Sequence, residues 1–187
     1  MQLSLGKSLR SYQFNIIQKI IERFQTTDRS MLIVAPTGSG KTITFTALVS
    51  QVLETKPDLR VLFMINRVQL VRQLERVLME NGLKVGVACG SIGRRELTER
   101  LTIASYLSLI NLRPVIAYNL IIWDEAHTFA PLLTDKESPL AKWYAELRAV
   151  NSRVRDIGFT ATPYTASEII YGDEAHFPSI TYEVHMK

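Results

Sequence analysis

The sequence predicts an α/β fold in which a parallel sheet carries helices on both faces. Short apolar runs alternate with longer amphipathic segments, which is the pattern of strands joined by helical crossovers. The apolar runs are free of charge except at their ends, as expected of strands buried on both faces. The chain has 187 residues, of which 47% are hydrophobic and 21% charged, and this suits one globular domain.

The apolar runs and the helical periodicity define the predicted elements. Strands are predicted at 31–35, 61–65, 85–88, 101–104, 120–123 and 156–160. Helices are predicted at 41–54, 67–81 and 139–149. In the second helix Val68, Val71, Leu74 and Leu78 recur at helical spacing and form one apolar face. The stretch 171–187 fits the alternation poorly and is expected to be an appendage.

Composition excludes several classes of protein. The single cysteine, Cys89, rules out an internal disulfide and a multi-cysteine zinc site; it is expected to pack as a small hydrophobe in a cytoplasmic protein. No segment approaches the ~20 apolar residues of a membrane span, so no membrane partner is expected. The net charge of +4 is compatible with a polyanionic partner without proving one. The basic cluster of Arg94, Arg95 and Arg100 is interleaved with Glu96 and Glu99, which favours a solvated, salt-bridged face. The alternative is that the cluster adds phosphate contacts.

A glycine-rich segment, APTGSGKT at 35–42, follows the apolar run MLIV and opens a predicted helix. This is the context of a phosphate-binding loop, in which glycines let backbone N–H groups surround phosphates at a helix N-terminus. Lys41 is predicted to reach the β and γ phosphates, and the Thr42 hydroxyl to bind Mg²⁺. Ala35 stands where the strict pattern has its first glycine, and the alternative is an ordinary glycine-rich turn. The predicted nucleotide-binding residues of the loop are Pro36, Thr37, Gly38, Ser39, Gly40, Lys41 and Thr42.

Two carboxylates, Asp124 and Glu125, end the apolar run in LIIWDEAH at 120–127. Groups at the carboxyl edge of a parallel sheet face the ligand crevice. We therefore expect Asp124 to hold Mg²⁺ and Glu125 to position and deprotonate an attacking water. Together with Lys41 they form the predicted catalytic set. The alternative is an acidic first turn of a helix, stabilised by the helix dipole.

In this order, APTGSGKT, DEAH and GFTATP (158–163) resemble the first motor domain of a superfamily 2 DNA/RNA helicase or translocase. LRSYQ at 9–13 resembles the adenine-sensing motif of these domains. LFMINRVQLVRQ at 62–73 and TIASYLSL at 102–109 resemble their loops that contact the nucleic-acid backbone, and FPSITYEV at 177–184 is a weaker continuation. Within the superfamily, the DEAH-box pattern with LRSYQ resembles the branch of type I and III restriction translocases and RadD-like repair ATPases.

The resemblance implies a RecA-like P-loop NTPase fold. It implies an N-terminal adenine-motif helix within 1–30, a core at 31–165, and a tail or linker at 166–187 toward an absent second domain.

The resemblance also implies roles for single residues. Gln13, with Arg10, would read the adenine edge, since an amide suits adenine's adjacent donor and acceptor. Thr160 and Thr162 would couple ATP hydrolysis to nucleic-acid binding, and His127 would relay the nucleotide state. The implied backbone contacts are Asn66, Arg67, Gly90, Ser105 and Tyr106. The alternatives are a threonine pair at a strand end, a core histidine, a packed tyrosine and a solvated arginine.

The leading hypothesis is the ATP-binding first motor domain of an ATP-dependent DNA helicase or translocase. It would use ATP with Mg²⁺ and bind nucleic acid, with DNA favoured over RNA by the branch resemblance. Such motors close two RecA-like domains around ATP, and an arginine finger is worth about 10³ to 10⁵ in kcat. Weak hydrolysis is therefore expected of this domain alone. The alternative is a non-catalytic nucleic-acid- or protein-binding module. A small-molecule kinase would explain the phosphate loop but not GFTATP or LRSYQ.

Overall fold

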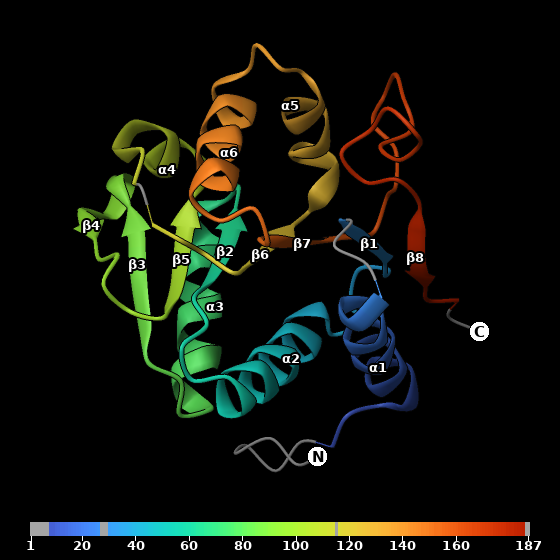
Figure 1. The fold of residues 1–187 in the computed structure, drawn as a ribbon. Coiled ribbons are helices and arrows are strands. Elements are labelled where there is room, and N and C mark those ends of the chain that lie inside the picture. Colours follow the sequence, from blue (N-terminus) through green and yellow to red (C-terminus); the bar gives the residue numbers. More distant parts are fainter. Residues whose placement is uncertain (1–7, 27–29, 115, 186–187) are drawn as a thin grey trace.

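Parallel strands form the centre of the molecule, as the apolar runs predict (Figure 1). The computed structural model describes residues 8–26, 30–114 and 116–185. Within these residues the sheet has eight strands in the order β4-β3-β5-β2-β6-β7-β1-β8. Their bounds are Met31–Val34 (β1), Val61–Ile65 (β2), Val85–Cys89 (β3), Arg94–Arg95 (β4), Leu101–Ser105 (β5), Leu120–Asp124 (β6), Arg155–Thr160 (β7) and Ile180–Glu183 (β8). All neighbours pair in parallel except β4, which is antiparallel to β3.

Helices cover both faces of this sheet (Figure 1). The longer ones are Ser11–Thr26 (α1), Lys41–Thr55 (α2), Val68–Glu80 (α3) and Pro139–Val150 (α6). The shorter ones are Tyr106–Leu112 (α4), Ala130–Thr134 (α5), and the 3₁₀ turns Gly90–Ile92 (η1) and Ala126–Thr128 (η2). The predicted α/β fold is confirmed, and every predicted strand and helix is found with ends within one residue of the prediction.

Two buried clusters hold the layers together, one on each face of the sheet. On the face of α1, α2 and α3, the Phe45 ring lies 4.6 Å from that of Phe159 and 5.7 Å from that of Phe63. On the face of α5 and α6, Trp123 packs on Phe129 with ring centroids 5.4 Å apart. Cys89 is fully buried on β3, so its prediction as a core residue is confirmed.

The C-terminal stretch differs from the prediction. The sequence predicted an appendage at 171–187, but β8 pairs with β1 and Phe177 is fully buried. The Phe177 ring packs where Gly158 has no side chain: a Cβ there would lie 2.6 Å from the ring. The pattern was missed because β8 has only four residues and is half-buried rather than apolar. The domain boundaries at 1–30, 31–165 and 166–187 stay predictions, and residues 1–7, 27–29 and 186–187 lie outside the described residues.

No described helix is both long and apolar enough to cross a membrane.

Candidate nucleotide and nucleic-acid site

The predicted site residues collect along one edge of the sheet, where the parallel strands end. The phosphate loop follows β1, Asn66 follows β2, Gly90 follows β3, Tyr106 follows β5, Glu125 follows β6 and Thr162 follows β7. Residues from distant parts of the sequence meet here because parallel strands place their carboxyl ends at one edge, where α/β folds bind ligands. Arg10 and Gln13 reach the same edge from the start of α1.

The phosphate loop turns sharply between β1 and α2. Gly38 and Gly40 have φ values of 76° and 77°, in the left-handed region that glycine adopts without strain. A Cβ added at Gly38 would meet nothing within 4 Å, so the loop keeps open space there. Lys41 is the first residue of α2 and Thr42 the second, so both lie at the positive end of the helix dipole.

Ala35 departs from the strict loop pattern without disturbing it. Among the described residues, positive φ outside glycine occurs only at Arg113 and Glu125, so Ala35 needs no glycine-like backbone. Its N–H donates to the carbonyl of Thr160 at 2.8 Å, and its side chain is buried. Ala35, the first residue of the loop, therefore extends the hydrogen-bonded pairing of β1 with β7 by one residue.

A chain of polar contacts connects the phosphate loop to the ends of β6 and β7. Lys41 Nζ lies 3.4 Å from Glu125 Oε1, and Glu125 Oε2 lies 3.5 Å from His127 Nδ1. His127 Nδ1 is 2.9 Å from the Thr160 hydroxyl and 3.4 Å from that of Thr162. Glu125 has a left-handed backbone with φ 54°, which turns the chain sharply between Asp124 and η2. The three motifs therefore form one network.

Asp124 has an unusual protonation equilibrium. Burial, and after it the charge of Glu125, raises the pKa of its carboxyl from 3.8 to about 6, although Lys41 acts in the opposite direction. Lys41 and a backbone hydrogen bond therefore compensate an ionised carboxylate at this position only in part. A divalent cation bound there would supply the rest of that compensation, so Asp124 fits the predicted metal site. Thr42, its other predicted ligand, lies in the first turn of α2.

Beside this network lies a cavity of about 330 Å³. Its lining joins Thr37 of the loop, Asp124, Glu125 and His127 with Asn66 and Arg67 from the end of β2. Asn66 and Arg67 are exposed. The predicted backbone-contacting pair therefore adjoins the predicted catalytic carboxylates.

The predicted adenine motif contacts the predicted phosphate loop directly. Gln13 is buried, with its Nε2 donating to Gly40 O at 3.2 Å and Ser39 O at 3.4 Å. Its Oε1 accepts from the Arg10 N–H at 2.9 Å. The Tyr12 hydroxyl also donates to Ser39 O. The predicted adenine reader thus has its amide engaged within the protein, and Tyr12 is a site residue that the sequence reasoning missed.

Two predicted backbone-contact positions are joined by a residue that was not predicted. Ser108 Oγ accepts from the Gly90 N–H at 2.6 Å and from the Ser105 hydroxyl at 2.8 Å. Both groups are therefore engaged within the protein. Ser108 lies within TIASYLSL at 102–109, and the only feature of the sequence that indicated this contact is its position three residues after Ser105. Tyr106 is half-buried, with its ring edge-on to Phe129.

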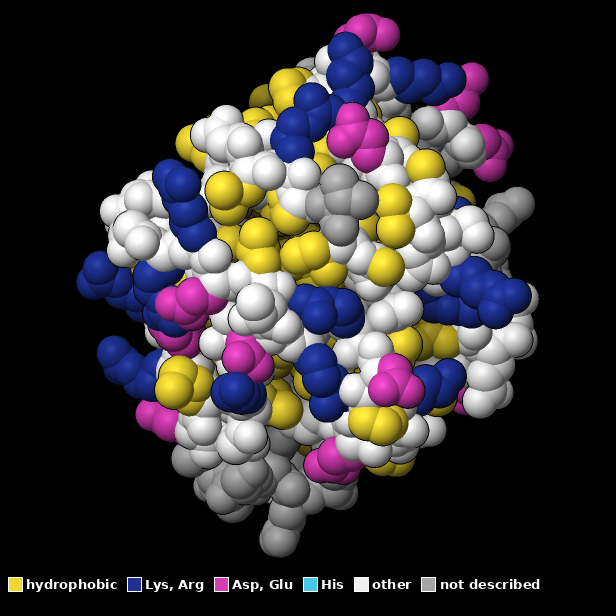
Figure 2. Space-filling model, turned by 60° about the vertical axis from the view of Figure 1, so that its left-hand side comes forward, with side chains coloured by type: hydrophobic (Ala, Val, Ile, Leu, Met, Phe, Trp, Pro, Cys, Tyr) yellow, Lys and Arg dark blue, Asp and Glu magenta, His cyan; other side chains and the backbone are white. Residues whose placement is uncertain are grey.

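The basic cluster near β4 has acidic partners. Arg94 is ion-paired with Glu75 at 2.6 Å and with Glu96 at 2.7 Å. These two carboxylates raise the pKa of the Arg94 guanidinium. Lys and Arg side chains on this side of the molecule are interspersed with Asp and Glu (Figure 2). The prediction of a salt-bridged face is confirmed for Arg94.

Sequence comparisons find relatives among restriction enzymes. The family model described as type III restriction enzyme, res subunit, matches residues 6–165. The chain is similar to the endonuclease subunit of the type I restriction enzyme EcoAI of Escherichia coli, with 27% identity over 190 residues and 96% of this chain covered. The chain spans only 22% of that relative's length.

Structure comparisons find the same fold in helicases. The Hef helicase domain of Pyrococcus furiosus has a TM-score of 0.70 at 23% identity, covering 93% of this chain and 37% of that one. A nuclease-deletion mutant of the type ISP restriction-modification enzyme LlaGI, in complex with a DNA substrate mimic, has a TM-score of 0.66 at 16% identity, covering 96% and 20%. At these identities the likeness establishes the fold.

Proposed function

The chain belongs to the family of the res subunit of type III restriction enzymes, and we propose that it is the ATP-binding first motor domain of an ATP-dependent DNA helicase or translocase. Its fold is that of the RecA-like N-terminal domain of superfamily 2 helicases. That much of the predicted family and fold is confirmed. The bound nucleotide, the metal, the nucleic acid and the partner domain belong to the proposal.

The observation that carries the proposal is the polar network from Lys41 through Glu125 and His127 to Thr160. A helicase motor needs its phosphate-binding group, its water-activating carboxylate and a relay to the nucleic-acid track in mutual contact. This network supplies a candidate for each. A simple glycine-rich turn with an acidic helix start gives no reason for these contacts between three separate strand ends.

In the proposed reaction, Lys41 binds the β and γ phosphates of ATP, while Thr42 and Asp124 hold Mg²⁺. When bound by these residues, Mg²⁺ would neutralise charge that develops on the phosphates. Glu125 orients an attacking water and accepts its proton. Lys41 and Glu125 are ion-paired at 3.4 Å, so nucleotide binding would separate them and free the carboxylate for water.

DNA is the proposed track, with a second RecA-like domain as partner. The LlaGI enzyme of the same fold was solved in complex with a DNA substrate mimic, which supports the choice of DNA. The EcoAI relative is far longer than this chain, which supports a motor with further parts. A second domain would supply an arginine finger, so the chain alone should turn over ATP slowly.

The test is ATP hydrolysis with and without duplex DNA, measured before and after a second RecA-like domain is supplied. We expect DNA-stimulated turnover that is lost in Lys41→Ala and Glu125→Gln. Lys19→Ala is the matched control, because Lys19 is exposed on α1 and pairs only with its neighbour Glu22 among the described residues. Wild-type rates in the first two variants would exclude the proposed catalysis. ATP binding without turnover under all conditions would instead support the non-catalytic module.

A further inference from the structure

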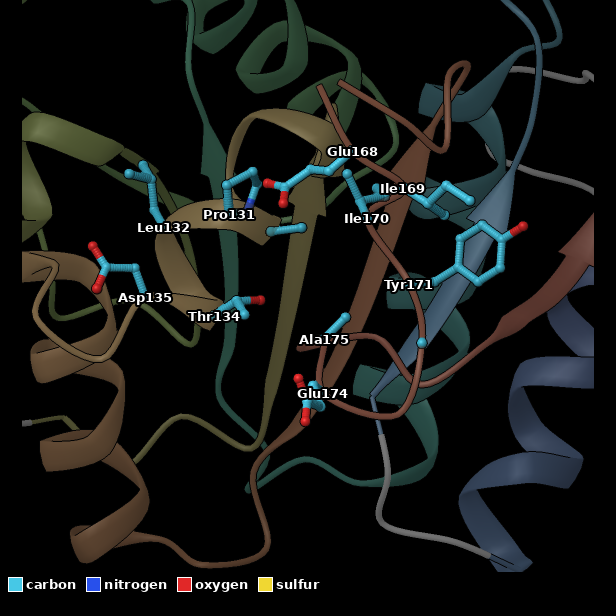
Figure 3. A pocket seen from close by; sticks show the side chains of 12 residues that line it. Pro131, Leu132, Thr134, Asp135, Glu168, Ile169, Ile170, Tyr171, Glu174 and Ala175 are labelled. Atoms are coloured by element: carbon cyan, nitrogen blue, oxygen red, sulfur yellow. The ribbon is translucent and has the colours of Figure 1, made fainter. Parts of the chain in front are cut away.

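A second groove lies apart from the nucleotide site, between α5 and the segment 168–175 (Figure 3). Its volume is about 650 Å³, within the range of ordinary ligand sites. None of the residues assigned to ATP, Mg²⁺ or nucleic acid lines it. The proposed ATPase therefore does not account for this groove.

The walls of this groove are tied to the core and to each other. Ile170 is 3% exposed, and its N–H donates to Pro163 O at 3.1 Å. At one end the His176 N–H donates to the Thr134 hydroxyl at 3.2 Å, which joins the two walls. The groove is thus a built feature of the fold and not a gap beside a loose loop.

The lining combines apolar surface with unpaired negative charge. Leu132, Ile169 and Tyr171 supply apolar area, and the Ile169 side chain is 61% exposed. The acidic side chains are Asp135, Glu168 and Glu174, and the lining contains no Lys, Arg or His. Figure 3 shows the Glu168 side chain extending from its segment toward Pro131 on α5. In the described part of the chain, none of the three carboxylates has a basic partner within 4.0 Å.

This charge restricts the kind of ligand. The chain as a whole is positive, with a net charge of +4, so an acidic groove is a local exception that repels a nucleic-acid backbone. A single metal ion is also a poor fit, since no three His, Cys, Asp or Glu side chains converge on a cation site anywhere in the described residues. Separated carboxylates beside apolar surface match a chain that carries separated positive charges and apolar side chains.

We propose that the groove between α5 and residues 168–175 docks a segment of a partner protein that alternates basic and apolar residues. The carboxylates would pair with its Lys or Arg side chains, while Ile169, Leu132 and Tyr171 would cover its apolar ones. The proposal goes beyond ATP hydrolysis and does not depend on it.

The position of the groove gives such docking a route to the nucleotide site. One wall, α5, follows η2, which contains His127. The other wall follows Thr162 along the chain, through the Pro163 carbonyl that holds Ile170. Each wall is therefore connected along the chain to one partner of the His127–Thr160 contact: α5 to His127 and the segment 168–175 to Thr160.

The first experiment tests charge. The probe is a fluorescein-labelled peptide of alternating Lys and Leu, and its dissociation constant is measured by fluorescence anisotropy. We expect the double variant Glu168→Gln/Glu174→Gln to weaken binding about fivefold. The matched control, Glu22→Gln/Glu54→Gln, removes the same charge from exposed sites on α1 and α2 and should leave binding within about twofold. Equal weakening by both double variants would overturn the proposal, because it would show attraction to net charge alone.

The second experiment tests the apolar surface. Ile169→Ser should weaken the same peptide, whereas Met79→Ser, at 59% exposure on α3, should not. An unaffected affinity in Ile169→Ser would overturn the proposal. Displacement of the peptide by spermidine, at an equal concentration of positive charge, would also overturn the proposal. The groove would then bind any polycation, with or without apolar side chains. A Glu/Leu peptide that fails to bind would support the assigned polarity.

Discussion

His127 Nδ1 lies 2.9 Å from the hydroxyl oxygen of Thr160, where β6 and β7 end side by side. Thr160 donates its one hydroxyl proton to the carbonyl of Thr162 at 2.8 Å. In the tautomer that carries its proton on Nδ1, the ring donates to Thr160 while Thr160 donates onward to Thr162. The same nitrogen lies 3.5 Å from Glu125 Oε2. A movement or change of charge at the proposed catalytic carboxylate would therefore alter the contact with Thr160 at the end of β7.

This contact predicts that His127→Ala uncouples the proposed ATPase from nucleic acid. ATP affinity should stay within about twofold, because His127 contacts the phosphate loop only through Glu125 in this network. Stimulation of the ATPase by DNA should fall about five- to tenfold. Thr160→Val keeps the shape but removes the acceptor, and should have the same effect. Steady-state ATPase titrations with DNA measure both. If the free-energy effect of the double variant equalled the sum of those of the single ones, the two residues would act separately and the relay would be refuted.

Asp124 predicts a pH-dependent stability. Its pKa is about 6 when folded against 3.8 unfolded, so the folded domain binds the proton more tightly, and the free energy of unfolding falls as pH rises through this interval. Asp124→Asn should therefore stabilise the nucleotide-free domain by about 3 kcal/mol above pH 6, with the gain vanishing below about pH 4. Urea unfolding at several pH values measures this. Asp58→Asn, at an exposed site, serves as control and should show no such pH-dependent gain.

The same ionisation should govern the proposed metal binding. Mg²⁺ requires the carboxylate form, so affinity for Mg²⁺-ATP should decline as pH falls below about 6. A fluorescent ATP analogue titrated across this range measures the decline. An affinity that stays constant down to pH 5 would remove Asp124 from the proposed metal site.

Tyr12 and Gln13 should affect nucleotides differently. Tyr12→Phe removes the hydrogen bond to Ser39 O, worth about 0.5–1.5 kcal/mol, together with the 3.5 Å contact that Arg10 Nη1 makes to the hydroxyl, and should weaken ATP and GTP equally. Gln13→Ala removes the loop support and the proposed adenine contact together, and should weaken ATP more than GTP. Competition binding with both nucleotides measures the ratio. Equal losses in Gln13→Ala would leave Gln13 as a support of the loop without an adenine role.

Ser108→Ala should loosen the connection between the loops at Gly90 and Ser105. It leaves the Gly90 N–H without its partner, at a cost of about 1–3 kcal/mol in stability. In folded protein, ATP affinity should be unchanged while the DNA concentration for half-maximal ATPase rises severalfold. Ser50→Ala, on α2, is the control. Unchanged DNA dependence would show that Ser108 serves stability alone.

Gly158→Ala should destabilise the fold through the C-terminal stretch. The added Cβ would lie 2.6 Å from the Phe177 ring and 2.8 Å from Ala126 Cβ, so one of them must move, costing about 1–3 kcal/mol. Phe177→Leu removes part of the ring and should recover some of that cost in the double variant. Thermal unfolding of the four proteins measures the coupling. Strict additivity would mean that Phe177 does not pack against Gly158 in solution.

The central strands and the chemical motifs were predictable because each has a local signature. The runs at 61–65 and 120–123 are buried on both faces and could be predicted as strands without knowledge of their neighbours. The order of the motifs then places Lys41, Glu125 and His127 at one edge through parallel pairing alone.

The short elements and cross-chain contacts had no such signature. α5 has five residues and β8 four, too few for a period to show. The bond between Ser108 and Gly90 spans 18 positions and depends on how η1 meets α4. The engagement of the Gln13 amide by Gly40 O depends on how α1 docks beside the loop, which no residue pattern encodes.

β8 lies parallel to β1, and the Val184 N–H donates to Val34 O at 2.9 Å, one residue before the phosphate loop begins. Tension on the chain beyond Val184 would act along the strand and load this hydrogen bond in shear. The carbonyl of Val34 that accepts this hydrogen bond belongs to the same peptide group as the Ala35 N–H, which donates to Thr160 O on β7. The phosphate loop is therefore anchored between β7 and β8, and a mechanical pull on β8 would reach it without passing through the helices.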